Sequence, residues 1–193
     1  LKFDSSLPMA KINSDYTNYL TPRISFRYSP NGNSDISSKN ILLDYNNLFS
    51  LNRIGANHEV EGGESLSLGL EFKRDNIDGF NNFDLKIANN LRFNENKQLP
   101  TKSKLNRTRS DIFGNLNYNI NNDFKIGYFF SYDRDLEYSN LEQINFEYGA
   151  NNFFTNFSYY TEDNDMGNKE NIKNFSKYEL NKDNKISFEM NKD

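Results

Sequence analysis

The sequence predicts an all-β chain, an antiparallel up-and-down meander that forms part of a large transmembrane β-barrel. Three observations predict this fold. Apolar and polar residues alternate along most of the chain, short and long connections alternate between these runs, and 15% of the residues are aromatic although only 35% are hydrophobic. Low hydrophobicity is typical of disordered chains, but such chains are poor in aromatic residues. These rings therefore need an apolar environment.

Each alternating run predicts one strand with an apolar and a polar face, because successive side chains of a strand point to opposite sides. The runs lie at 24–28, 66–72, 83–93, 116–120, 124–132, 144–148, 153–159 and 186–190, with a weaker one at 174–180. Asn89 breaks the parity of the third run. No segment repeats apolar residues at helical spacing for long enough to predict a helix. We therefore expect about nine strands.

The connections favour a membrane barrel over a soluble β-sandwich, in which alternating strands are equally expected. Short polar turns are predicted near 78–82, 121–123, 149–152 and 181–184, and longer polar connections at 30–62, 94–110, 133–142 and 162–173. In an up-and-down barrel every second connection lies on the same rim, so the short turns share one rim. Outer-membrane barrels have this asymmetry, with short periplasmic turns and long extracellular loops.

The second face of the strands is hydrophilic, with Asn115, Asn117 and Asn119 in one row. Small barrels fill their interior with side chains, whereas wide barrels have a wet lumen. About nine strands leave open edges, and unpaired backbone groups are costly in lipid. We therefore expect residues 1–193 to be a fragment of one outer-membrane barrel domain that this chain does not close by itself.

Composition argues against several other functions. The net charge is −4 and the basic residues form no dense run, which disfavours nucleic acid as a partner. The absence of cysteine removes disulfides and cysteine-based metal sites, and we expect neither cofactor nor metal. The single histidine, His58, has Glu59 beside it and Ser65 and Ser67 nearby. A hydrolase needs a nucleophile, a base and an orienting group within reach, so we expect no enzyme.

The most specific part of the sequence lies between residues 20 and 70. Its motif segments are Leu20-Thr21-Pro22-Arg23, Tyr28-Ser29-Pro30-Asn31, Asp44-Tyr45 with Leu48-Phe49, Arg53 with Gly55, and Val60-Glu61-Gly62-Gly63 running into Leu68-Gly69-Leu70. This text resembles the C-terminal barrel region of the LPS-assembly outer-membrane protein family (LptD, also called organic solvent tolerance protein). Beyond residue 80 the chain resembles the family in layout alone.

Physical chemistry assigns structural roles to these motif residues. Pro22 lacks a donor and is expected at a strand start or a bulge. Gly62 and Gly63 offer positive φ angles where the long loop returns to the wall. Leu48 and Phe49 are expected to anchor that loop over the barrel mouth, with a possible ion pair between Asp44 and Arg53. Two interpretations of Arg53 stay open, namely loop folding alone and direct contact with sugar or phosphate.

The resemblance implies that the chain is the wall and the extracellular loops of a barrel that inserts lipopolysaccharide (LPS) into the outer leaflet of a Gram-negative outer membrane. It implies four partners: LPS, a plug lipoprotein inside the barrel, a periplasmic LPS-bridge protein reached through a domain absent here, and membrane lipid. In the family, lipid tails leave through a weakly paired seam between the first and last strands. Neither seam strand is placed in this sequence, which predicts the middle to later part of the barrel.

Four basic residues share the polar parity and are expected to face the lumen, where they can meet anionic core sugars: Arg23, Arg27, Lys86 and Arg92. The asparagines of this face can hydrogen-bond sugars or the plug, because amides both donate and accept; compositional drift toward asparagine is the alternative. A general porin or substrate channel shares these features and is the second functional hypothesis. A secreted β-sandwich adhesin is the third.

Overall fold

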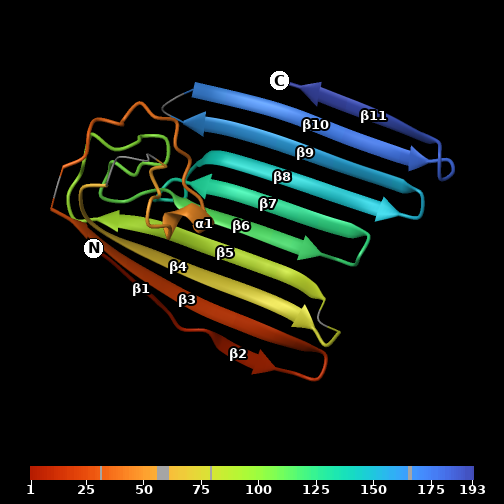
Figure 1. The fold of residues 1–193 in the computed structure, drawn as a ribbon, viewed down its shortest axis with the longest axis horizontal. Coiled ribbons are helices and arrows are strands. Elements are labelled where there is room, and N and C mark those ends of the chain that lie inside the picture. Colours follow the sequence, from red (N-terminus) through yellow and green to blue (C-terminus); the bar gives the residue numbers. More distant parts are fainter. Residues whose placement is uncertain (31, 56–60, 79, 165–166) are drawn as a thin grey trace.

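The structure is a computed structural model that describes residues 1–30, 32–55, 61–78, 80–164 and 167–193. These residues form one antiparallel sheet, in which every strand from β3 onward pairs with the next strand in sequence (Figure 1). The elements are β1 (Lys2–Ser6), β2 (Met9–Ile12), β3 (Tyr16–Ser29), α1 (Tyr45–Leu48), β4 (Gly63–Asn76), β5 (Asn81–Arg92), β6 (Ile112–Asn119), β7 (Phe124–Tyr132), β8 (Ser139–Ala150), β9 (Phe153–Asn164), β10 (Gly167–Glu179) and β11 (Lys185–Lys192). The predicted all-β, up-and-down fold is confirmed.

The described residues hold eleven strands, two more than the nine that the alternation predicts. The nine expected runs correspond to β3 through β11. The two additional strands, β1 and β2, both pair with β3 and share one register: Ser6 is opposite Arg23, and Met9 is opposite Leu20. They escape a search for alternation because the intervening Leu7-Pro8 interrupts the segment.

Two prolines explain the gap between β1 and β2. The N–H of Leu7 donates to the carbonyl of Pro22 at 3.1 Å, but Pro22 has no N–H to donate in return. Because the hydrogen-bonding groups of successive residues point to opposite sides of a strand, Pro8 withholds a donor from the free edge. Pro22 itself lies inside β3, opposite Leu70. The strand start or bulge expected for it is therefore wrong.

The connections are sorted between the two ends of the sheet, as predicted (Figure 1). The short turns at 77–80, 120–123, 151–152 and 180–184 lie at one end, and the long connections at 30–62 and 93–111 lie at the other. Two predicted loops are wrong in extent. β9 continues to Asn164 and β10 starts at Gly167, so the loop expected at 162–173 is mostly strand, and β8 already starts at Ser139. Most side chains there are polar on both faces, with Leu141 and Ile172 as exceptions, so the alternation ends before the ladder does.

One face of the sheet, the outer face, carries the apolar rows and has no second sheet packed on it within the described residues. Ile24, Leu70, Phe146 and Phe188 remain 38–59% exposed there. A soluble sandwich would cover such rows with a partner sheet. The uncovered apolar face fits a strand wall whose outer side meets hydrocarbon.

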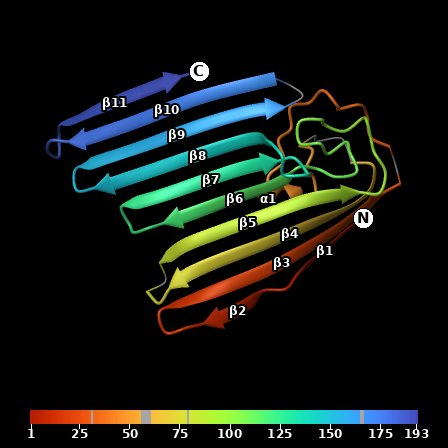
Figure 2. The same cartoon turned by 180° about the vertical axis from the view of Figure 1, so that it is seen from behind.

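The opposite, inner face carries a folded unit made by the two long connections, which we call the loop core (residues 32–55, 61–62 and 93–111). Figure 2, seen from behind, shows α1 beyond the strands, so the loop core lies on one side of the sheet. Its buried apolar side chains are Ile36, Leu43, Tyr45, Leu48, Phe49, Ile54, Leu99 and Leu105, packed against Ala88 and Phe113 of the wall. The two connections are joined by Ile36 N–H to the Gln98 carbonyl at 2.9 Å and Leu43 N–H to Ser103 Oγ at 2.9 Å.

Gly114 on the outer face provides a test of the wall packing. A Cβ built on Gly114 would lie 2.1 Å from Cζ of Phe130, because that ring lies across the glycine of the neighbouring strand. Replacing Gly114→Val should therefore destabilise the wall by about 1–3 kcal/mol, the usual cost of overpacking.

The measurement is the urea dependence of unfolding of the full-length protein in lipid vesicles. Gly127→Ala is the matched control, because a Cβ on Gly127 meets its nearest atom at 3.5 Å, an ordinary contact. The double variant Gly114→Val with Phe130→Leu replaces the ring with a smaller side chain, so it should recover part of the lost stability. Equal unfolding midpoints for Gly114→Val and the control would contradict the assignment.

Candidate functional site

Most of the motif residues converge in the loop core. The Asp44 side chain accepts a hydrogen bond from the Asn47 backbone N–H at 2.7 Å, and the Asn47 side chain accepts one from the Asp44 N–H at 2.9 Å. This reciprocal pairing satisfies two N–H groups at the start of α1. It fixes the direction of the short helix, so that Tyr45, Leu48 and Phe49 are all buried.

Gly69 of β4 is the surface on which two aromatic rings rest. A Cβ built on Gly69 would lie 2.7 Å from Cζ of Phe49 and 3.1 Å from Cε2 of Tyr45. A glycine inside a strand often marks such a close approach. Wall cations cover the same rings: the Arg23 guanidinium is 4.3 Å from the Phe49 centroid, and the Lys86 ammonium is 5.9 Å from the Tyr45 centroid.

Arg53 and Glu61 form the ionic centre of the loop core. Nε and Nη2 of Arg53 donate to the two carboxylate oxygens of Glu61 at 2.6 and 2.5 Å, and each residue is only 3% exposed. The remaining donors of the guanidinium reach three polar side chains of the wall, Ser65, Ser67 and Asn90, at 2.9, 3.0 and 2.8 Å. The expected ion pair between Asp44 and Arg53 is therefore wrong, because Asp44 caps α1 and Glu61 neutralises Arg53.

Two arginines of the wall complete this centre. Arg92 donates from Nη1 to Glu61 and from Nη2 to the Gly62 carbonyl, the latter at 2.5 Å. Arg27 places Nε 3.9 Å from Glu61. Its other nitrogens donate to the carbonyls of the loop at Leu51 and Ser50, at 2.5 and 2.6 Å. The long loop is thus bound to β3, β4 and β5 through one carboxylate and its surrounding cations.

The glycines at the end of the long loop have separate roles. Gly63 has a positive φ of +87°, as expected where the loop returns to the wall, and a Cβ on it would lie 2.8 Å from Nη2 of Arg92. Gly62 contributes its carbonyl to Arg92. Gly55 also has a positive φ, +64°, and ends the turn that carries Arg53.

Glu61 is held ionised in spite of its burial. Burial by itself raises the pKa of a carboxyl group, but Arg53 first, and then Arg92 and Arg27, outweigh it and hold the pKa of Glu61 below its ordinary value. An ion pair this deeply buried is stabilising only while both charges and their hydrogen bonds are complete. The integrity of the loop core therefore depends on this carboxylate.

A second ion pair extends the loop core across the inner face. Lys102 Nζ lies 2.7 Å from Glu162 Oε1 of β9, and both side chains are buried. Closer to the loop, Ser131 of β7 donates to Asp111 at 3.1 Å, and Lys104 lies 3.7 Å from the same carboxylate. The sequence analysis missed these residues for two reasons. Partners so far apart in the chain form no recognisable motif, and Glu162 lies in a segment that was predicted to be a loop.

The structure divides the four basic residues that were expected to face the lumen. Arg27 and Arg92 are buried in the centre around Glu61, with only 8% and 5% of their surface exposed. The side chains of Arg23 and Lys86 keep 32% and 28% exposure at the lower margin of the loop core. Only this second pair is accessible from the inner face.

Below the loop core, toward the short turns, the inner face is lined by amide side chains. The paired positions Asn117, Gly127, Asn145 and Ser158 form one row across β6 to β9. The next row holds Asn119, Lys125, Glu147 and Asn156. The predicted hydrophilic face is therefore continuous from strand to strand.

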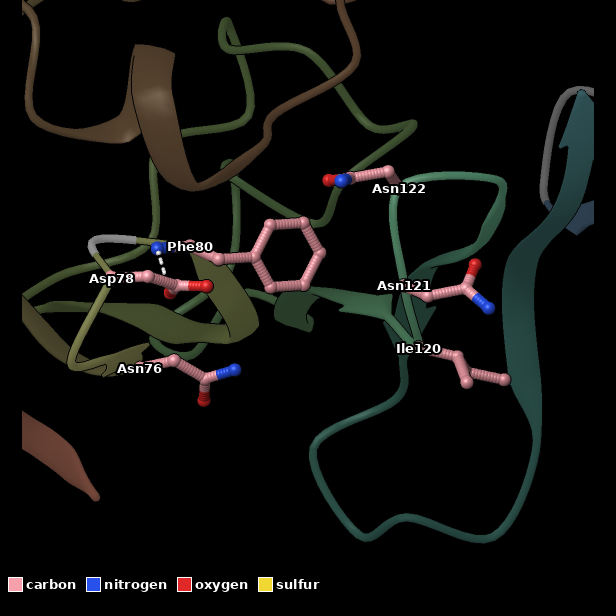
Figure 3. Close-up of a pocket in the computed structure, with 6 residues that line it drawn as sticks. All are labelled: Asn76, Asp78, Phe80, Ile120, Asn121 and Asn122. Carbon is pink, nitrogen blue, oxygen red and sulfur yellow. Dashed lines mark hydrogen bonds between the residues drawn. The ribbon is translucent and has the colours of Figure 1, made fainter.

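The rim of the short turns carries a separate hollow of about 550 Å³ between the β4–β5 and β6–β7 turns (Figure 3). Phe80, Asp78 and Asn76 line it from one turn, and Ile120 with Asn121 and Asn122 from the other. The only bond drawn among them is Phe80 N–H to Asp78 Oδ1 at 2.9 Å, which closes the turn itself. We find no reactive group there.

The described residues contain no group of three or more metal-ligating side chains that could hold an ion. No helix among them has the length and apolar character needed to cross a bilayer. His58, Glu59 and Val60, named in the sequence above, lie outside the described residues, as does Asn31.

Glu61 gives a direct test of the loop core. Glu61→Gln leaves Arg53 and Arg92 buried without a counter-charge, which should destabilise the loop core by about 3–5 kcal/mol. Because the pKa of Glu61 is lower in the folded protein than in the unfolded chain, its stabilisation is complete above the unfolded pKa and is lost as the pH falls through the folded pKa. The wild-type loop core should therefore open in acid, and the variant should be open at neutral pH.

Amide hydrogen exchange of residues 32–55 in the vesicle-bound protein measures this opening. Glu64→Gln is the control, because Glu64 is exposed three positions away on the same chain segment. Unchanged protection of the loop core in Glu61→Gln at pH 7 would rule out the ionic centre as its anchor.

Comparison with models of protein families matches residues 1–185 of the 193 to the family described as LptD, LPS transport system D. A search of curated proteins finds no match. The family match covers nearly the whole chain, including the strands of the inner amide rows and the entire loop core. It agrees with the resemblance carried by the motif segments between residues 20 and 70. The chain therefore belongs to the LptD family, which transports LPS at the outer membrane and is not a family of enzymes.

Proposed function

We propose that this chain is the wall and the extracellular loops of an outer-membrane barrel that inserts LPS into the outer leaflet. The observation that carries the proposal is the division of one sheet between an uncovered apolar outer face and a polar inner face. Hydrocarbon solvates the first and water the second, which is the arrangement of a wide membrane barrel. The remaining strands of the barrel lie outside residues 1–193, because edges cannot stay unpaired in lipid.

The loop core supports a role at the outer mouth of this barrel. It occupies the inner face at the end of the long connections and reaches from β3 to β9 through Lys102 and Glu162. The wall below it stays open and polar. A saccharide that travels through the lumen would meet amide side chains first and then the underside of the loop core.

Arg23 and Lys86 are the residues that we assign to the anionic core sugars. They are the accessible members of the four lumen-facing basic residues, and both lie beside aromatic rings of the loop core. Arg53, Arg27 and Arg92 are assigned to loop folding, because they are buried and their terminal nitrogens donate to Glu61, to polar side chains of the wall or to backbone carbonyls. Direct sugar contact by Arg53 is not supported by this geometry.

The partners follow from the same role. A plug lipoprotein would occupy the lumen against the polar rows, membrane lipid would surround the outer face, and a periplasmic LPS-bridge protein would deliver LPS through a domain that residues 1–193 do not contain. The localisation is the outer membrane of a Gram-negative bacterium.

Depletion of the protein tests the transport role. Because LPS would no longer reach the outer leaflet, surface-accessible LPS should fall and sensitivity to large hydrophobic antibiotics should rise. A plasmid copy should restore both, and a copy with Arg23→Gln and Lys86→Gln should restore them only in part. Loss of small-solute uptake with normal surface LPS would identify a porin in place of an LPS transporter.

A further inference from the structure

A hollow of about 410 Å³ lies on the inner face below the loop core, over β5 to β9. Its floor is Gly127 of β7. Its walls are predominantly amides, together with one ion pair and one further carboxylate: Asn81, Asn117, Asn119, Asn145, Asn156, Lys125, Glu147 and Asp84.

Gly127 creates this hollow. The other strand glycines have a local reason for their identity: Gly63 and Gly167 have positive φ angles, and Gly69, Gly114 and Gly149 lie under aromatic rings that a Cβ would meet at 2.7, 2.1 and 3.2 Å. Gly127 has neither, since its nearest neighbours are Asn117 Oδ1 at 3.5 Å and Asn145 Cβ at 3.7 Å. A strand glycine without such a reason is typical of a site that a ligand approaches closely.

The charges of the hollow disfavour an anionic ligand. Lys125 is the only cation in its lining, and its Nζ lies 2.7 Å from Glu147 Oε1. Asp84 adds a negative charge; its Oδ1 lies 4.0 Å from Lys86 Nζ and has no hydrogen-bond partner among the described residues. A phosphate would find no uncompensated cation here, whereas a hydroxyl can donate to Asp84 and exchange hydrogen bonds with the amides.

The lining of the hollow matches the hydroxyl rim of a sugar ring. Its amides both donate and accept hydrogen bonds, and Asp84 accepts from a hydroxyl. Phe129, two residues beyond Gly127 on the same face of β7, is partly buried and lies outside this lining.

We infer that the Gly127 hollow is a binding site for a neutral saccharide ring of the glycan that passes along this wall. The inference rests on the proposed LPS transport. It separates two tasks on one face: Arg23 and Lys86 contact the anionic part of the glycan at the margin of the loop core, and the Gly127 hollow holds an uncharged sugar closer to the short turns. The asparagines near Gly127 are therefore binding residues.

Photo-crosslinking in cells tests the hollow. A photoreactive residue at position 158, which is paired with Asn145 on the inner face, should form an adduct with LPS, and one at Phe157 on the outer face should not form an adduct through the glycan. Gly127→Leu fills the hollow and should abolish the adduct at position 158. Asn145→Ala, which removes an amide without filling the space, should weaken it. Ser187→Leu on β11 is the matched control, because it adds the same side chain to the same face far from the hollow.

The outcomes separate the two levels of the proposal. In cells whose LPS is truncated to its phosphorylated inner sugars, the adduct should disappear; a persistent adduct would mean phosphate recognition and overturn the inference. An adduct with a protein in place of LPS would also overturn it. If depletion leaves surface LPS unchanged, the transport role is wrong. If transport is demonstrated but an assembled Gly127→Leu variant gives as much adduct as the wild type, only the assignment of the hollow as a saccharide site is wrong.

Discussion

The loop core depends on the buried carboxylate of Glu61. One anion holds Arg53 of the loop together with Arg27 and Arg92 of two wall strands. Arg53 also donates to polar side chains of the wall, and Arg27 and Arg92 also donate to backbone carbonyls of the loop. Because the bonds join segments far apart in the chain, they convert two long polar connections into a unit with its own apolar core. Without this carboxylate, the buried arginines would lose their counter-charge, and the apolar cluster and the ion pairs of Lys102 and Lys104 would have to hold the loops to the wall.

This anchoring determines how the inner face is divided. Where the loop core rests, the wall presents small or apolar residues, Gly69, Ala88 and Phe113, whose paired positions form one row across β4, β5 and β6. Below that row the face is amide-rich and open. The same strands therefore carry an apolar contact surface beneath the loop core and a polar, open surface nearer the short turns.

The sequence predicted much of this architecture correctly. Alternation located β3 to β11, and the alternation of short and long connections located the two rims. The alternation pattern did not predict β1 and β2, where Pro8 interrupts a short segment. It also did not predict the end of β9 and the start of β10, where most side chains on both faces are polar. In the loop core, the motif residues Leu48, Phe49 and Gly69 lie together, but the partner predicted for Arg53 was wrong. Hydrophobic periodicity indicates which face of a strand is apolar. It carries no information on which side chains, far apart in the sequence, come into contact in the folded protein.

The sequence by itself determined the period of the strands, the polarity of each face and the family, because these are properties of neighbouring residues and of local motifs. Tertiary structure alone decided which charges are buried and which remain accessible. Arg27 and Arg23 have the same parity and lie four residues apart, yet one is enclosed around Glu61 and the other stays open to the lumen. That difference arises because the returning loop covers the part of β3 that carries Arg27 and leaves the part that carries Arg23 uncovered.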